Sequence, residues 1–247
     1  PVIAEAFVEE LVPKVTLHKT SKKVQTRAQY NGKAGWVRFC KFLANHPDRN
    51  DKIFEWVIKD LDAGRSIAIP IMFTDQARRL VQRINEHYME EVAAVFLGGA
   101  KEAKRRKPII DAAREGKIRC VVGMRKLMQR GLNVPKWDTL YYIMPMNNEP
   151  NWKQESCRIL TPMEGKRTPV IRMFIDQKMD RSMQCARSVL KMCWKFGYAK
   201  AKRTPKKLRD WMGVVSREEA LDGELPDFFE PEARVKGQPS NLGMRRL

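Results

Sequence analysis

The sequence lacks any pattern of closely spaced cysteines and histidines. Its five cysteines include no C-x-x-C pair, and none of its three histidines stands at ligand spacing from a cysteine. This spacing excludes the common zinc sites and argues against a disulfide framework. No apolar run approaches the length that crosses a membrane, and no signal peptide is recognisable. Scattered thiols are typical of a reducing compartment, so we expect a cytoplasmic protein without a membrane partner.

Acidic side chains are scarce relative to basic ones. The chain has 247 residues, and 48 Lys and Arg against 29 Asp and Glu give a formal net charge of +19. A surplus of this size predicts a polyanionic partner such as a nucleic acid, because basic surfaces attract and hold phosphate backbones. A basic surface without such a partner is the alternative. The length suits one large domain with or without an appendage.

Short apolar runs alternate with amphipathic segments along most of the chain. We expect strands near residues 15–18, 67–72, 92–96, 118–122, 140–144 and 170–175. We expect helices near residues 33–45, 51–63, 74–88, 101–115, 126–130, 149–160 and 177–198. Asn50 and Thr74 are the expected N-caps of two helices, and Gly64 is the expected end of the first. Continuous apolar strands separated by helices predict an α/β fold with a mostly parallel sheet flanked by helices.

The composition changes near residue 199. Residues 1–198 read as one domain, with lead-in elements over 1–65, a core over 66–176 and a closing helix over 177–198. Residues 199–247 read as a basic then acidic tail that is partly flexible: 200–209 contain six basic residues, and 218–232 contain seven acids together with Phe228 and Phe229. Such a tail either solubilises the protein or, with its acids and aromatics, mimics nucleic acid or recruits a partner.

Two polar motifs follow the strand at 118–122. The first is Gly131-Leu132-Asn133, and the second, about two dozen residues later, runs from Gln154 to Arg158. A glycine permits a tight turn beside a nucleotide, a polar side chain can then contact that nucleotide, and an arginine can reach a transferring phosphoryl group.

Further polar and glycine residues follow other predicted strands. Thr74 comes after the strand at 67–72, and Gly98-Gly99 after the strand at 92–96. Arg106 opens the next helix, in a segment from 101 to 130 with eleven basic and three acidic residues. Glycine turns and helix N-termini offer backbone amides to phosphates, so these positions predict contacts with a nucleic-acid backbone. A solvated basic helix face is the alternative.

The order and spacing of these segments resemble motifs IV to VI in the second RecA-like lobe of superfamily-two helicases. The resemblance covers roughly residues 1–198 and extends to phage recombination and branch-migration helicases of the UvsW type. It implies a RecA-like fold and a role in DNA recombination, repair or replication, in a host cytoplasm if the protein is phage-encoded. It also implies ATP and Mg²⁺, mostly held by a separate first lobe, and DNA as a sequence-tolerant partner.

The resemblance implies a role for each motif position. Arg158 would be an arginine finger, and the residues facing ATP would be Gly131, Asn133, Gln154 and Arg158. The residues holding successive phosphates of one DNA strand would be Thr74, Gly98, Gly99, Arg106 and Arg125.

The sequence departs from the helicase motifs at Asn133, Glu155, Cys157 and Thr161, and it lacks the Thr or Ser that the family usually has near Met124 and Arg125. Thr161 stands where the family has a second arginine finger, so efficient ATP turnover requires a substitute such as Lys153 or Arg167. A RecA-like module that binds nucleic acid without catalysis is therefore the first alternative, and a protein interaction through the tail is the second. No G-x-x-x-x-G-K-[ST] loop occurs in the sequence. With a start at Pro1, this predicts that a first lobe precedes the chain in the full-length protein.

Overall fold

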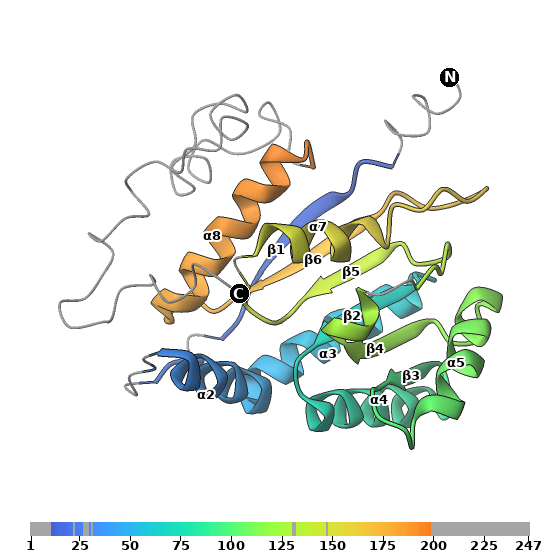
Figure 1. Ribbon diagram of the computed structural model, residues 1–247, viewed down its shortest axis with the longest axis horizontal. Coiled ribbons are helices and arrows are strands. Elements are labelled where there is room, and N and C mark those ends of the chain that lie inside the picture. Colours follow the sequence, from blue (N-terminus) through green and yellow to red (C-terminus); the bar gives the residue numbers. More distant parts are fainter. Residues whose placement is uncertain are drawn as a thin grey trace.

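A computed structural model describes residues 11–198 of the chain, apart from residues 22, 27–29, 31, 130–131 and 147. Within these residues, six strands form one sheet in the order β1-β6-β5-β2-β4-β3, and every neighbouring pair is parallel (Figure 1). The strands are β1 (Lys14–Lys19), β2 (Ile67–Ile71), β3 (Ala93–Phe96), β4 (Cys120–Met124), β5 (Thr139–Tyr142) and β6 (Val170–Ile175).

Helices cover both faces of the sheet (Figure 1). Residues of the first three described helices pack in one core and residues of the last four in the other. The helices are α2 (Gly32–Asn45), α3 (Pro47–Asp62), α4 (Thr74–Tyr88), α5 (Ala103–Glu115), α6 (Arg125–Met128), α7 (Glu149–Cys157) and α8 (Asp180–Lys195). Ile67 and Ile69 of β2 belong to the first core, whereas Ala68 belongs to the second. Burial on both faces explains why the strands read as continuous apolar runs.

The predicted strands and helices are all present, but two predicted caps are wrong. Helix α3 begins at Pro47, and its N-cap is His46. Proline fixes φ near the helical value and lacks the N–H that the first turn leaves unbonded, so it favours this start. Asn50 lies inside the helix, where its amide donates to the carbonyl oxygen of Ala44 at 3.0 Å. Likewise, the N-cap of α4 is Phe73, and Thr74 is the first helical residue.

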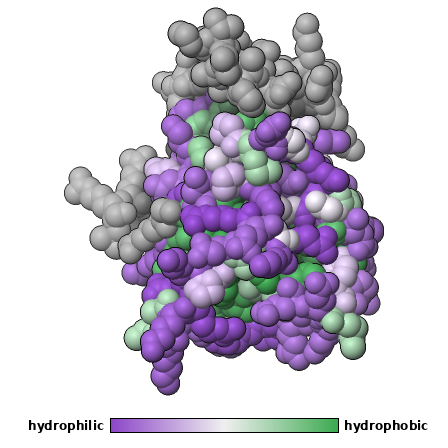
Figure 2. All heavy atoms as spheres, turned by 90° about the vertical axis from the view of Figure 1, so that its right-hand side faces the viewer, coloured by the Kyte–Doolittle hydropathy of each residue, from purple (hydrophilic) through white to green (hydrophobic). Residues whose placement is uncertain are grey.

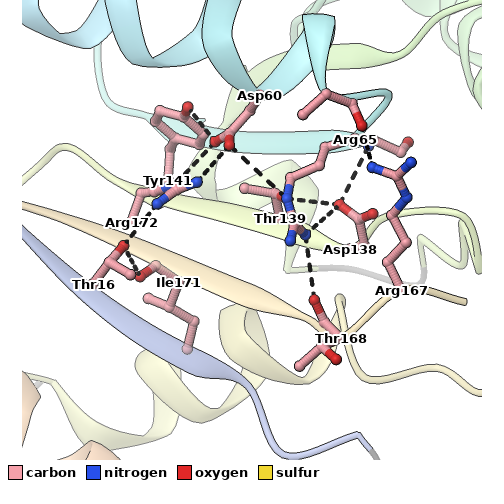
Figure 3. A network of polar contacts seen from close by, with 12 residues as sticks. Thr16, Asp60, Arg65, Asp138, Thr139, Tyr141, Arg167, Thr168, Ile171 and Arg172 are labelled. Atoms are coloured by element: carbon pink, nitrogen blue, oxygen red, sulfur yellow. Dashed lines mark hydrogen bonds and ion pairs between the residues drawn. The ribbon is translucent and has the colours of Figure 1, made fainter.

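A polar network joins α3 to β5 and β6 (Figure 3). The buried carboxylate of Asp60 accepts hydrogen bonds from Arg172 at 2.5 and 2.9 Å and from the hydroxyl of Tyr141 at 2.7 Å. Arg65 lies 3.5 Å from the carboxylate of Asp138 and extends the network along β5. Because each buried charge has an opposite partner, the network fixes the helix against the sheet without leaving an isolated ion.

His18 on β1 lies in an aromatic environment. Its ring centroid is 4.1 Å from that of Trp56 and 5.2 Å from that of Phe174. Burial, with a smaller contribution from the charge of Arg172, lowers the pKa of His18 from 6.5 to about 4. The folded protein therefore keeps this ring neutral at a pH where the unfolded chain protonates it.

The free energy of unfolding should consequently depend on pH through His18. Its contribution is constant above the unfolded pKa of 6.5 and falls as the pH drops toward 4. We expect a loss of about 2 kcal/mol between pH 7 and pH 5, because the unfolded state binds the proton more tightly. Urea unfolding of the wild type and of His18→Phe at both pH values measures this. If the free energy of unfolding changes by the same amount between the two pH values in both proteins, His18 does not contribute.

Candidate nucleic-acid and nucleotide site

The loops expected to hold phosphates lie together at one edge of the sheet. Because the strands are parallel, the loops after β2, β4 and β3, which are neighbours in that order, all leave from the carboxyl edge. Thr74 follows β2, and Gly98 and Gly99 follow β3; all three are exposed. Gly99 has φ 93°, a left-handed conformation that favours glycine. This edge is where open α/β sheets bind ligands.

Helix α5 presents basic side chains next to these loops. Arg106 is half-buried, and the exposed residues around it are Lys101, Lys104, Arg105 and Lys107. Glu102, the N-cap residue of α5, pairs with Arg78 of α4 at 3.0 Å and so connects the two helices. Figure 2 faces the side of the molecule on which α5 lies and shows a mostly hydrophilic surface. The arrangement can attract a phosphate backbone.

Arg125, at the end of β4, is directed into the protein. Its side chain is 13% exposed, lies 2.7 Å from the carboxylate of Glu155 and donates to the carbonyl oxygen of Met144 at 3.2 Å. In this arrangement Arg125 links the carboxyl ends of β4 and β5 to helix α7. Its contact with DNA stays a prediction.

Glu155 is a residue whose role the sequence did not reveal. Its side chain is buried in α7, where it also accepts a hydrogen bond from the amide of Gln129 at 3.1 Å. Burial raises the pKa of the Glu155 carboxyl, while Arg125 and Gln129 oppose that change. A buried carboxylate needs a cation, and Arg125 supplies it. The available signal was an acid at a position of the second motif where the sequence departs from the family pattern, but the identity of its partner depends on the tertiary structure.

Arg158 brings the two nucleotide motifs into contact. It follows the last residue of α7, and its guanidinium donates to the carbonyl oxygens of Leu132 at 2.6 Å and Gln129 at 2.5 Å. Gly131 lies outside the described residues, and Gln129 and Leu132 are the nearest described residues on its two sides. The arginine of the second motif therefore lies against the loop of the first.

The two remaining predicted nucleotide residues are at the surface. Gln154 is exposed on α7, four residues before Arg158, so the two lie on the same side of that helix. The side chain of Asn133 is exposed, and its carbonyl oxygen accepts from Arg114 at 2.9 Å. Both side chains are accessible to solvent.

Lys166 is a further basic residue, and it connects the segments that follow the two motifs. Its ammonium donates to the carbonyl oxygens of Pro135 at 2.7 Å and Thr161 at 2.8 Å. Burial lowers the pKa of the Lys166 amine to about 8. Of the two expected substitutes for the missing arginine, Arg167 instead donates to the carbonyl oxygen of Ala63, and the ammonium of Lys153 lies 5.8 Å from the ring centroid of Phe196.

Acidic, cysteine and histidine side chains do not gather into a metal site in the part of the chain that the structure describes. None of the helices within residues 11–198 that the structure describes is long and apolar enough to cross a bilayer.

Comparison with known proteins identifies the fold. A scan against protein-family models and a search of curated proteins gave no match. The C-terminal domain of the DEAD-box protein Dbp5 matches with a TM-score of 0.52 and 14% identity, over 78% of this chain and 89% of that domain. S. cerevisiae Dbp5 bound to RNA and ADP BeF3 gives 0.52 and 15%, over 86% of this chain and 46% of that one. T4 UvsW gives 0.51 and 12%, over 68% and 33%.

These likenesses show that the chain has the RecA-like fold of helicase C-terminal lobes, a parallel sheet flanked by helices, which is the fold class predicted from the sequence. The chain spans less than half the length of the two longer structures.

Proposed function

We propose that this chain is the C-terminal motor lobe of an ATP-dependent DNA helicase or translocase. The observation that supports this function best is the contact of Arg158 with the carbonyls of Gln129 and Leu132. It places the candidate arginine finger beside the loop expected to face the nucleotide. The contact supports this role because phosphoryl transfer needs a guanidinium held near the nucleotide, and Arg158 is held next to the loop proposed to face it.

In this proposal ATP with Mg²⁺ lies between this lobe and a first RecA-like lobe. Hydrolysis of the ATP supplies the free energy for movement along the strand. Asn133 and Gln154 would contact the nucleotide from this side, together with Gly131. Arg158 would exchange its two neutral carbonyl partners for the terminal phosphate, because the phosphate adds a full opposite charge and oxygens spaced for both arms of the guanidinium fork. The described residues offer no cluster of acids for Mg²⁺, so its protein ligands would come from the first lobe.

The nucleic-acid strand would bind at the carboxyl edge of the sheet. Thr74, Gly98 and Gly99 would offer hydroxyl and backbone groups to phosphates, and Arg106 would add charge. Arg125 would act from behind this surface, unless its ion pair with Glu155 opens when the strand binds. Contacts of this kind are made to the backbone, so binding would tolerate any sequence.

The dependence of binding on salt tests this interface. The affinity of the 247-residue chain for a fluorescent single-stranded oligonucleotide should fall between 50 and 200 mM KCl, with a log-log slope of about 0.7 per phosphate neutralised. Arg106→Gln should reduce the slope by about 0.7. Lys117→Gln is the control, because Lys117 is 77% exposed at the opposite edge and pairs with Glu115. A flat salt dependence in the wild type would rule out the electrostatic interface.

A nucleic-acid-binding lobe without a catalytic role is the second candidate function. The burial of Glu155 against Arg125 favours it, since the helicase family has an arginine at the position of Glu155 and here a buried acid replaces it. Thr161 supports the same alternative, because it removes the second finger. The two functions differ in ATP turnover.

A further inference from the structure

A cavity of about 260 Å³ lies between α3 and α4, near the carboxyl edge of the sheet. Its apolar wall comes from Ile53, Leu80 and Ile143, and its polar lining includes Gln76, Arg79 and Arg83. The volume is slightly below the range of about 300–1,000 Å³ that holds drug-sized ligands, so a single small ring system fits better than a larger molecule.

No contact within the described fold explains why the amide of Gln76 is buried. The side chain is 3% exposed, yet neither its nitrogen nor its oxygen has a hydrogen-bond partner among the described residues. A buried amide without partners costs about 1–3 kcal/mol, and such groups are rare in folded proteins. A ligand that offers one donor and one acceptor side by side would satisfy both atoms of Gln76.

Arginines from the same helix give the cavity positive charge. Arg79 donates to the side-chain oxygen of Asn45 at 2.6 Å, and Arg83 pairs with Asp51 at 2.8 Å. The spacing along α4 puts Gln76, Arg79 and Arg83 on one face of the helix, and all three line the cavity. Two cations against one lining carboxylate leave a net positive charge, which suits a ligand attached to a phosphate.

The chemistry of the cavity matches a nucleobase on a phosphate. A planar heterocycle needs apolar walls, and its edge presents an adjacent donor and acceptor, as adenine does to a glutamine or asparagine amide. The cavity also adjoins the predicted path of the strand, because Gln76 lies in the first turn of α4, two residues after Thr74.

We propose that this cavity binds one base of the nucleic-acid strand, with the amide of Gln76 on the base edge and Arg79 and Arg83 near the attached phosphate. The inference rests on the proposed function for the strand itself and adds a base contact to a lobe otherwise expected to hold only the backbone. A base held in this way would anchor the strand to this lobe during a step.

The test compares a base-bearing oligonucleotide with an abasic strand of equal length and charge, using the full 247-residue chain. We expect wild-type protein to prefer the base-bearing strand by about tenfold or more, in line with the contribution of one stacked and hydrogen-bonded base. Gln76→Leu should reduce this preference about tenfold and leave the affinity for the abasic strand unchanged. Gln82→Leu is the matched control, because Gln82 lies on the same helix but is exposed and bonded to Glu86.

Urea unfolding of Gln76→Leu separates binding from folding. The variant should be at least as stable as the wild type, because leucine removes an unsatisfied amide from a buried position. An equal preference for bases in wild type and Gln76→Leu overturns the inference. The inference is also overturned if the protein binds AMP tightly through Gln76 but binds the two strands equally well. The cavity would then be a site for a free nucleotide. If the wild-type protein binds neither strand, that result instead contradicts the proposed function.

Discussion

Replacing Arg158 by alanine is expected to lower nucleic-acid-stimulated ATP hydrolysis by about a thousandfold when the chain is joined to a first RecA-like lobe. The guanidinium is the one candidate finger that matches the helicase motif, and it already lies against the loop carbonyls of Gln129 and Leu132. Without it, charge that develops on the transferring phosphoryl group lacks its partner from this lobe. Steady-state phosphate release with saturating single-stranded DNA measures the effect.

Two controls separate catalysis from structure. Lys153→Ala removes an exposed cation from the same helix and should change the rate only severalfold. Arg158→Lys keeps the charge but loses the forked geometry, so it should recover only part of the rate. DNA affinity and the urea midpoint should be measured for each variant. An unchanged rate in Arg158→Ala would favour the non-catalytic alternative.

Replacing Asp176 by alanine is expected to lower the free energy of unfolding by about 3–5 kcal/mol. Asp176 is fully buried after β6 and accepts hydrogen bonds from Thr20 at 2.8 Å, Arg49 at 2.9 Å and Ser182 at 2.9 Å. Arg49 is also fully buried, so the substitution leaves a cation without its counter-ion in the interior. Urea denaturation of the two proteins gives the difference directly.

The matched control is Glu55→Ala, which removes a carboxylate from an ion pair of similar length at the surface. Lys52 and Glu55 are 3.0 Å apart with side chains 39% and 53% exposed, and such pairs contribute less than about 1 kcal/mol. The double substitution Arg49→Met with Asp176→Leu should recover much of the loss, because it removes both buried charges. Equal losses in the buried and surface variants would contradict this account of Asp176.

The fold was predictable because hydrophobic periodicity determines it locally. Apolar runs such as β2 are continuous because helices cover both faces of the sheet. A helix between consecutive strands returns the chain to the same edge, so the strands pair in parallel. Helix ends were less predictable. Asn50 has a favourable capping side chain, but Pro47 allows an earlier start to α3 and Asn50 bonds Ala44 instead.

The candidate site was predictable only as to which loops form it. Parallel strands bring Thr74 and Gly98 to one edge of the sheet, and this placement does not depend on side-chain contacts. The direction of Arg125 depends on Glu155, which is 30 residues away in sequence and becomes its neighbour through the packing of α7. The unsatisfied amide of Gln76 likewise follows from how α3 and α4 pack, because glutamine at a helix start usually signals only a capping residue.

The side-by-side placement of β1 and β6 has a consequence for biosynthesis. Thr16 and Ile171, which bond each other across this pair, are separated by 155 positions. A ribosome therefore releases β1 long before β6, its neighbour in the described sheet, exists. Non-local pairing of this kind slows folding, and an unpaired edge is exposed to aggregation meanwhile. β1 can therefore pair with β6 only after translation has passed Ile175.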